Sequence, residues 1–175
     1  FSNSSWRFAP TFGDLDGDGD LDVLVGEEFG NLFYAENTAG LNQPFAFAPI
    51  QFGYQELDVG QVSKPQIVDV NKDGLNDLVI GERNGNLNYF ENIGTPDTPL
   101  FEFAPTNKLF GKVDTRDLGY VTGYSAPTVL KIDETMEIIT GSQSGAIKRY
   151  LMEADSLLAG TFMQTDSNYA DLKVG

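Results

Sequence analysis

The sequence DLDGDGDLDVLVGE, residues 14–27, indicates how this chain is organised, because it recurs as DVNKDGLNDLVIGE at residues 69–82. The two segments align without a gap at an offset of 55 residues. Each joins a loop rich in acidic residues to an apolar run that ends at a glycine, Gly26 or Gly81. Such self-similarity indicates that the chain is built from copies of one supersecondary unit.

A third copy is present in a degenerate form. It begins with SAP at residues 125–127 and continues with IITG at residues 138–141. Its loop is two residues shorter than the other two, and Asp133 is the one aspartate left in it. We therefore expect one domain over residues 1–175, with copies at about 6–60, 61–120 and 121–175.

The copies have the pattern of β-strands. The run of residues 23–25 stops at Gly26, and a turn containing Gly30 leads into the apolar residues 32–34, which is typical of a hairpin. Residues 151–158 are the one short helical candidate. A period of 55–62 residues with about four strands in each copy predicts an all-β fold, a β-propeller segment of about three four-stranded blades. A β-sandwich of irregular repeats is the alternative.

Propellers close with about 4–8 blades, and closure removes the exposed sheet edges. Because three copies are too few, we expect further blades of a larger propeller, or a partner chain, to cover the open edges.

The two intact loops share the pattern D-x-[DN]-x-D-G-x-x-D, which predicts two structural Ca²⁺ sites. Ca²⁺ prefers roughly six to eight oxygen ligands in a flexible loop, whereas Mg²⁺ retains several waters. Positions 1, 3, 5 and 9 offer side-chain oxygens, and position 7 offers its carbonyl. The expected ligands are Asp14, Asp16, Asp18, Asp20 and Asp22 in the first loop, and Asp69, Asn71, Asp73, Leu75 and Asp77 in the second.

Two other interpretations of these loops compete with a calcium site. An EF-hand needs a glutamate at position 12 and flanking helices, but position 12 is Val25 or Ile80 within a strand-like run. A solvated acidic turn explains one such loop better than it explains two at matching places in a repeat.

Composition excludes several functional classes. The formal net charge of −15 argues against a nucleic-acid partner, because phosphates need cations. With no histidine or cysteine, the chain lacks the usual zinc ligands, thiol chemistry and a Ser-His-Asp triad. No apolar run approaches the length of a membrane span, so we expect no direct membrane insertion. Glu27 and Glu82 could form an acid pair for glycoside hydrolysis, but a repeated position usually serves the fold. We expect no catalytic activity in this chain.

Six aromatic residues leave a choice between packing between blades and stacking on sugar rings. They are Trp6, Tyr34, Tyr54, Tyr89, Tyr120 and Tyr124.

From residue 6 to residue 150 the chain resembles FG-GAP/VCBS repeats, which include the calcium-binding blades of integrin α propellers. The resemblance rests on GDLDGDG at 13–19 with Asp22, and on VDVNKDG at 68–74 with Asp77. The segments YAEN at 34–37 and YFENIGT at 89–95 resemble repeats of surface proteins in Bacteroidota. The resemblance implies a propeller, structural calcium and an extracellular or cell-surface location in an exported bacterial protein.

A binding, adhesion or display scaffold is the function that this resemblance favours, with a protein or glycan ligand at the cell surface as the expected partner. The alternative is a segment of a propeller-type polysaccharide lyase, or another carbohydrate-active enzyme, whose catalytic residues lie elsewhere.

Overall fold

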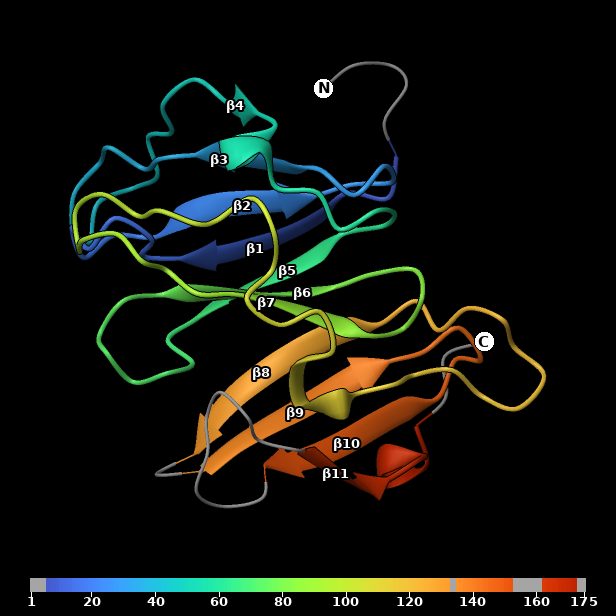
Figure 1. Ribbon diagram of the computed structural model, residues 1–175. Coiled ribbons are helices and arrows are strands. Elements are labelled where there is room, and N and C mark those ends of the chain that lie inside the picture. The colour runs from blue at the N-terminus through green and yellow to red at the C-terminus, as the bar shows by residue number, and fades with distance from the viewer. Residues whose placement is uncertain (1–5, 133–134, 153–161, 173–175) are drawn as a thin grey trace.

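The computed structural model describes residues 6–132, 135–152 and 162–172, which form three antiparallel sheets stacked on one another (Figure 1). The first sheet contains β1 Ala9–Gly13, β2 Asp22–Gly26, β3 Leu32–Ala35 and β4 Gln51–Phe52. The second contains β5 Lys64–Val68, β6 Asp77–Gly81 and β7 Leu87–Phe90. The third contains β8 Ala126–Ile132, β9 Thr135–Gly141, β10 Ile147–Met152 and β11 Phe162–Asp166. Short 3-10 helices lie at Tyr54–Glu56, Phe110–Lys112 and Tyr169–Asp171. The predicted all-β class is confirmed.

One detail of the predicted strands is wrong. The second sheet has three strands, and a single bridge between Tyr89 and Asn107 takes the place of the fourth. Pro105 lies just before this bridge and has no N–H to extend a ladder. The helical candidate at 151–158 begins inside strand β10, and its residues 153–158 lie outside the described residues. Within the described ranges the three sheets do not close into a ring.

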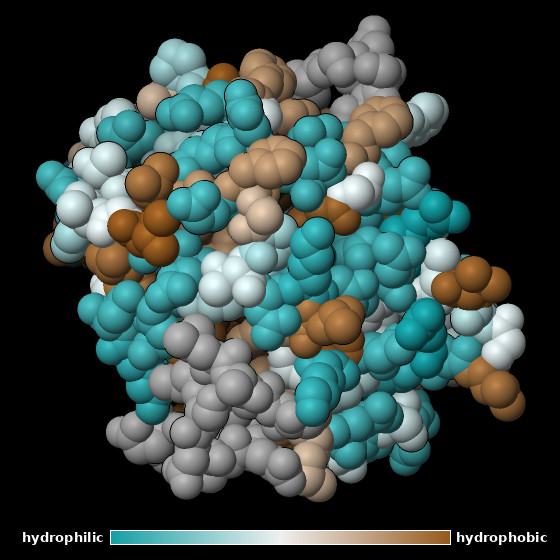
Figure 2. Space-filling view, viewed as in Figure 1, coloured by the Kyte–Doolittle hydropathy of each residue, from teal (hydrophilic) through white to brown (hydrophobic). Residues whose placement is uncertain are grey.

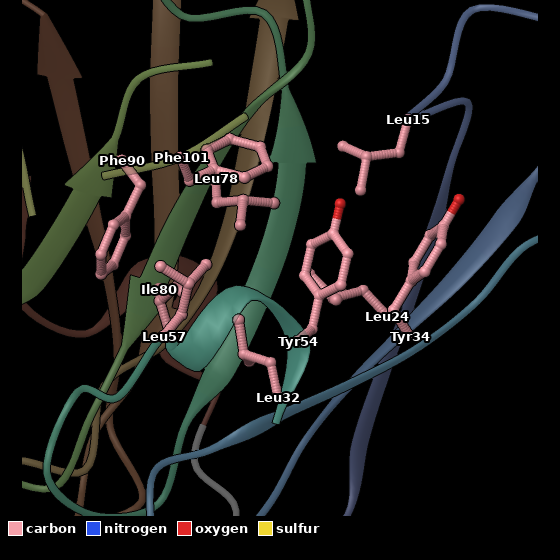
Figure 3. Packing of buried hydrophobic residues seen from close by; sticks show 10 residues of the cluster. All are labelled: Leu15, Leu24, Leu32, Tyr34, Tyr54, Leu57, Leu78, Ile80, Phe90 and Phe101. Carbon is pink, nitrogen blue, oxygen red and sulfur yellow. The ribbon is translucent and has the colours of Figure 1, made fainter. Parts of the chain in front are cut away.

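Two apolar clusters hold the stack together. Ten buried side chains from the first and second sheets, from the loop between β1 and β2 and from the segments after the two sheets form one cluster (Figure 3). In it Tyr34 and Tyr54 pack with ring centroids 4.7 Å apart. A second cluster joins the second sheet to the third. The middle sheet therefore buries both faces, with Leu78 and Ile80 in the first cluster and Val79 in the second.

The repeated glycines let neighbouring sheets approach closely. A Cβ atom on Gly26 would lie 2.2 Å from the carbonyl oxygen of Ser63, and one on Gly81 would lie 2.4 Å from that of Ser125. Gly141, the third copy's equivalent, has no such neighbour, since its Cβ would meet Ala126 at 3.9 Å. The glycine is needed where another copy follows.

A repeated serine clamps each copy to the one before it. The Ser63 hydroxyl accepts from the N–H of Glu27 at 2.8 Å and donates to the carbonyl of Asn31 at 2.8 Å. Ser125 does the same to the second copy, accepting from Glu82 N–H at 2.9 Å and donating to the Asn86 carbonyl at 2.7 Å. These bonds fix the start of the first strand of the second and third copies, β5 or β8, against the preceding hairpin.

The surface in Figure 2 is mostly hydrophilic, with hydrophobic residues in small separate groups. No helix in the described part of the chain is long and apolar enough to span a membrane.

Candidate metal centre

The first acidic loop connects β1 to β2 and is closed by a buried aspartate. Asp22 is fully buried; its Oδ2 accepts from the N–H of Leu15 at 3.0 Å, and its Oδ1 from the N–H of Asn37 at 2.9 Å. Burial raises the pKa of Asp22, although these bonds and Tyr34 oppose the rise. Asp22 therefore joins the start of the loop to the end of β3.

Three acids of this loop converge. Asp14, Asp16 and Asp18 each offer a carboxylate oxygen, and these oxygens all lie within 4.8 Å of one another. The Oδ1 atoms of Asp14 and Asp16 are buried and have no hydrogen-bond partner among the described residues. Burial, followed by repulsion from Asp22 and Asp18, raises the pKa of Asp16 to about 6. No ion pair within the described ranges involves Asp14, Asp16 or Asp18, so no described cation neutralises their charge.

Asp20 has a role that the sequence did not indicate. Its carbonyl was the expected ligand, but its side chain is 5% exposed and turned inward. Its Oδ2 accepts from the N–H of Gly40 at 2.7 Å, while its Oδ1 is buried without a partner within the described chain. Asp20 lies outside the group of three converging acids and ties the loop to the segment after β3.

The second acidic loop, between β5 and β6, is already satisfied by protein groups. Asp69 accepts from the N–H of Lys72 at 2.7 Å and pairs with Lys131 Nζ at 3.4 Å. The amide of Asn71 donates to Asp73 Oδ2 at 2.9 Å. The Leu75 N–H donates to Asp73 Oδ1 at 2.8 Å. Three acids do not converge here as they do in the first loop.

Asp77 closes the second loop as Asp22 closes the first. Its carboxylate accepts from the N–H of Val70 at 2.9 Å, the N–H of Asn92 at 2.8 Å and the hydroxyl of Tyr89 at 3.2 Å. Burial raises the pKa of Asp77, and these bonds oppose the rise. The ninth position of the motif thus closes the loop in both copies.

The two loops are linked to each other. The side-chain amide of Asn76 donates to the carbonyl of Asp14 at 2.6 Å. Gly17 has φ +74°, and a Cβ there would lie 2.7 Å from the carbonyl oxygen of Pro96. A hollow of about 60 Å³ lies between the loops. The first loop is therefore held against the second copy.

Asn37 and Asn92 were missed as functional positions, although their repetition at an offset of 55 was visible. The Oδ1 of Asn37 accepts from the N–H groups of Ala39 and Ala46 at 3.3 and 3.0 Å. The Oδ1 of Asn92 does the same for Gly94 and Leu100 at 3.0 and 3.1 Å. They organise the segment that follows the third strand of each copy.

Glu27 and Glu82 are both buried, and each bonds within its own hairpin turn. Glu27 Oε1 accepts from the N–H and the amide of Asn31 at 2.9 and 3.0 Å. Glu82 accepts from the amide of Asn84 at 3.0–3.1 Å. These contacts support the structural interpretation of the repeated glutamates.

The aromatic residues divide between core and surface. Tyr34, Tyr54 and Tyr89 are buried in the two apolar clusters, which favours packing for these three. Trp6 and Tyr120 are exposed, and Tyr124 is half-buried at the opposite end of the strands from the acidic loops. Asp133 of the third loop lies outside the described residues.

No protein-family model matches the chain, and neither a curated protein nor a solved structure is significantly similar to it.

Proposed function

We propose that the chain is a segment of an extracellular β-propeller, stabilised by structural calcium, that serves as a binding, adhesion or display scaffold and not as an enzyme. The observation that carries this proposal is the first acidic loop. It gathers three carboxylates and leaves buried oxygens of Asp14 and Asp16 without a partner among the described residues. Buried charges are expected to be paired or to coordinate a metal.

The residues fit a hard cation. Asp14, Asp16 and Asp18 would hold Ca²⁺ in the first loop, where it would supply the positive charge that the loop lacks. The second loop has no buried carboxylate oxygen without a partner among the described residues, since Lys131 pairs with Asp69 and the Asn71 amide donates to Asp73. We therefore expect the first loop to bind calcium more tightly than the second.

Calcium in these loops would stabilise the folded chain. An ion that binds the folded loop alone, with a dissociation constant of about 10 μM, would contribute about 2.7 kcal/mol at roughly 1 mM calcium. This is a large share of the roughly 5–15 kcal/mol that stabilises a typical domain.

The packing of the sheets supports the propeller. Leu78 and Ile80 of the second sheet are fully buried in the cluster shared with the first sheet. Their equivalents in the first sheet, Val23 and Val25, are half-buried and line an apolar hollow of about 140 Å³. Phe52, on the same sheet, is 63% exposed. A further blade packed on this face would bury it as the first sheet buries Leu78 and Ile80.

Calorimetric titration of the calcium-stripped chain tests the metal proposal. We expect calcium to bind and to raise the melting temperature, and Asp16→Asn to remove the tighter site. Asp73→Asn should weaken the second site, while Glu102→Gln, which removes the same charge at an exposed position, should change neither. Absence of calcium binding, with a melting temperature that ignores chelator, would contradict the proposal.

A further inference from the structure

A hollow of about 550 Å³ lies at the opposite end of the strands from the acidic loops. It is lined by Arg7, Phe8, Val62, Lys64, Tyr124 and Gln143. These residues precede β1, β5 or β8, start β5, or follow β9. Strands β1, β5 and β8 each begin at their right-hand end in Figure 1. The volume is within the range of roughly 300–1,000 Å³ that is usual for sites of small organic ligands.

The hollow is built from one position of all three copies. Arg7, Val62 and Tyr124 each lie three residues before the proline in the first strand of their copy, which is β1, β5 or β8. Their φ angles are 55°, 59° and 50°. Left-handed backbone is uncommon for residues other than glycine and is a genuine outlier for the β-branched Val62. Because the same conformation recurs in all three copies, it sets the direction in which the chain enters the first strand of each copy.

Hydrogen bonds between copies hold this backbone in place. The N–H of Val62 donates to the carbonyl of Glu28 at 2.9 Å, and the N–H of Tyr124 donates to the carbonyl of Arg83 at 3.0 Å. The wall of the hollow is therefore fixed by the stacking of the sheets before any ligand arrives, which lowers the cost of binding.

Two cationic side chains line the hollow in a strongly acidic chain. The chain has 11 Lys and Arg against 26 Asp and Glu, and Arg7 and Lys64 both lie here. Arg7 Nε contacts Glu28 Oε2 at 3.2 Å, and its guanidinium lies 5.3 Å from the ring centroid of Tyr124. Hydrogen bonds from Arg7 and Arg83 lower the pKa of Tyr124, although burial opposes this.

Among the described residues, Lys64 has no partner of opposite charge. Burial together with the charge of Arg7 lowers its pKa. An anion beside Lys64 would favour its charged form. The Oε1 of Gln143 accepts from Thr122 Oγ1 at 2.5 Å, which leaves its amide NH₂ group as a further donor.

We propose that this hollow binds an organic carboxylate carried on a six-membered ring. Lys64 and Arg7 would pair with the carboxylate, because a guanidinium and an ammonium both suit it. Phe8 and Tyr124 would contact the ring, since aromatic side chains offer large apolar faces.

Two matched pairs of probes test this inference on the full chain by ligand-observed NMR and calorimetry. Benzoate is compared with neutral benzamide, and glucuronate with neutral glucose, at constant ionic strength. We expect at least one acid to bind about tenfold more tightly than its neutral partner, the loss expected for one charge pair. The preferred acid then distinguishes an aromatic acid from a sugar acid.

Substitutions locate the binding. Lys64→Met should weaken the preferred acid about tenfold, while Lys108→Met, which removes the same charge at an exposed position, should leave it unchanged. If Lys64→Met fails to fold, Arg7→Leu at the exposed rim should weaken the acid instead. Equal binding of acids and neutral partners, or insensitivity to both substitutions, would overturn the inference. If sulfate binds as tightly as the better acid, the ring of the ligand contributes nothing to binding, and that part of the inference would be wrong.

Discussion

Gly81 shows how closely two copies approach at a single residue. Its Cβ would lie 2.4 Å from the carbonyl oxygen of Ser125, and backbone atoms cannot yield as a flexible side chain can. We expect Gly81→Ala to lower the free energy of unfolding by about 2–3 kcal/mol, a typical cost of overpacking. Urea denaturation followed by circular dichroism would measure it.

Gly141 is the matched control, because its added Cβ would meet Ala126 at an ordinary 3.9 Å. Gly141→Ala should leave the free energy of unfolding within about 0.5 kcal/mol of the parent, as surface substitutions usually do. Equal losses in the two variants would argue against close packing as the cause.

Asp117 compensates a buried cation in the third sheet. Lys148 is 3% exposed; its Nζ lies 2.8 Å from Asp117 Oδ1 and donates to the carbonyl of Thr115 at 3.0 Å. We expect Asp117→Asn to lower the free energy of unfolding by about 2 kcal/mol at pH 7. This is less than the 3–5 kcal/mol typical of a broken buried pair, because Asp117 is partly exposed.

The pH dependence of that loss identifies the ion pair. Burial would raise the pKa of Asp117, but bonds from Lys148, Ser144 and Ser142 outweigh it and lower the pKa. A lowered folded-state pKa contributes stability above the unfolded value, and this is lost as the pH falls through the folded value. The difference between parent and Asp117→Asn should be constant above about pH 5 and shrink below about pH 4. A difference that persists at pH 3 would indicate a packing effect.

At the scale of elements, strand β8 reaches into the acidic loop of the copy before it. Lys131 Nζ lies 3.4 Å from Asp69 Oδ2, so the loop between β5 and β6 already has a cation beside it. If the loop binds calcium as proposed, Lys131→Met should tighten that site about threefold, the size of a partly exposed ion pair. Calorimetry of the variant and of Lys108→Met would show it, and an unchanged affinity would mean that Lys131 does not compete with the ion.

The strands were predictable where side-chain alternation and glycines agree. The apolar runs at 23–25 and 78–80 became β2 and β6, and both end at the expected glycine. The second copy resembles the first in sequence, so the absence of a fourth strand in its sheet was not predictable. A fourth strand requires backbone pairing beyond the single bridge between Tyr89 and Asn107.

The candidate sites were predictable to different degrees. The spacing of Asp14, Asp16 and Asp18 was enough to predict that their carboxylates converge, because convergence depends on local chain curvature. The closing bonds of Asp22 to Leu15 and Asn37 depend on tertiary contacts with β3. The hollow lined by Arg7 and Lys64 could not be predicted from a sequence motif, because it is formed by backbone conformation and by residues from three copies.

At the scale of the whole molecule, the two ends of the stack differ. On the outer face of the third sheet, Glu137 pairs with Arg149 at 2.6 Å, and Arg149 lies 5.8 Å from the ring centroid of Tyr169. The outer face of the first sheet instead exposes Phe12 and Phe52.

We therefore expect the chain to self-associate through its first sheet when no further blade covers it. Phe52 is 63% exposed, so Phe52→Lys should reduce association without disturbing the core. Sedimentation velocity over a range of concentrations would measure it. Leu118→Lys, at a fully exposed position outside this face, is the control, and an equal effect of both variants would mean that general charge controls association.

The bond from Asn76 to the carbonyl of Asp14 joins two loops that belong to different copies. An event that reshapes one loop is therefore felt in the other, and by thermodynamic necessity the influence is mutual and equal in size. If both loops take up ions, their occupancies are not independent. If binding at one loop strengthens binding at the other, the molecule would respond to calcium over a narrower range of concentration than two separate sites would, and if binding at one loop weakens binding at the other, the range would be wider.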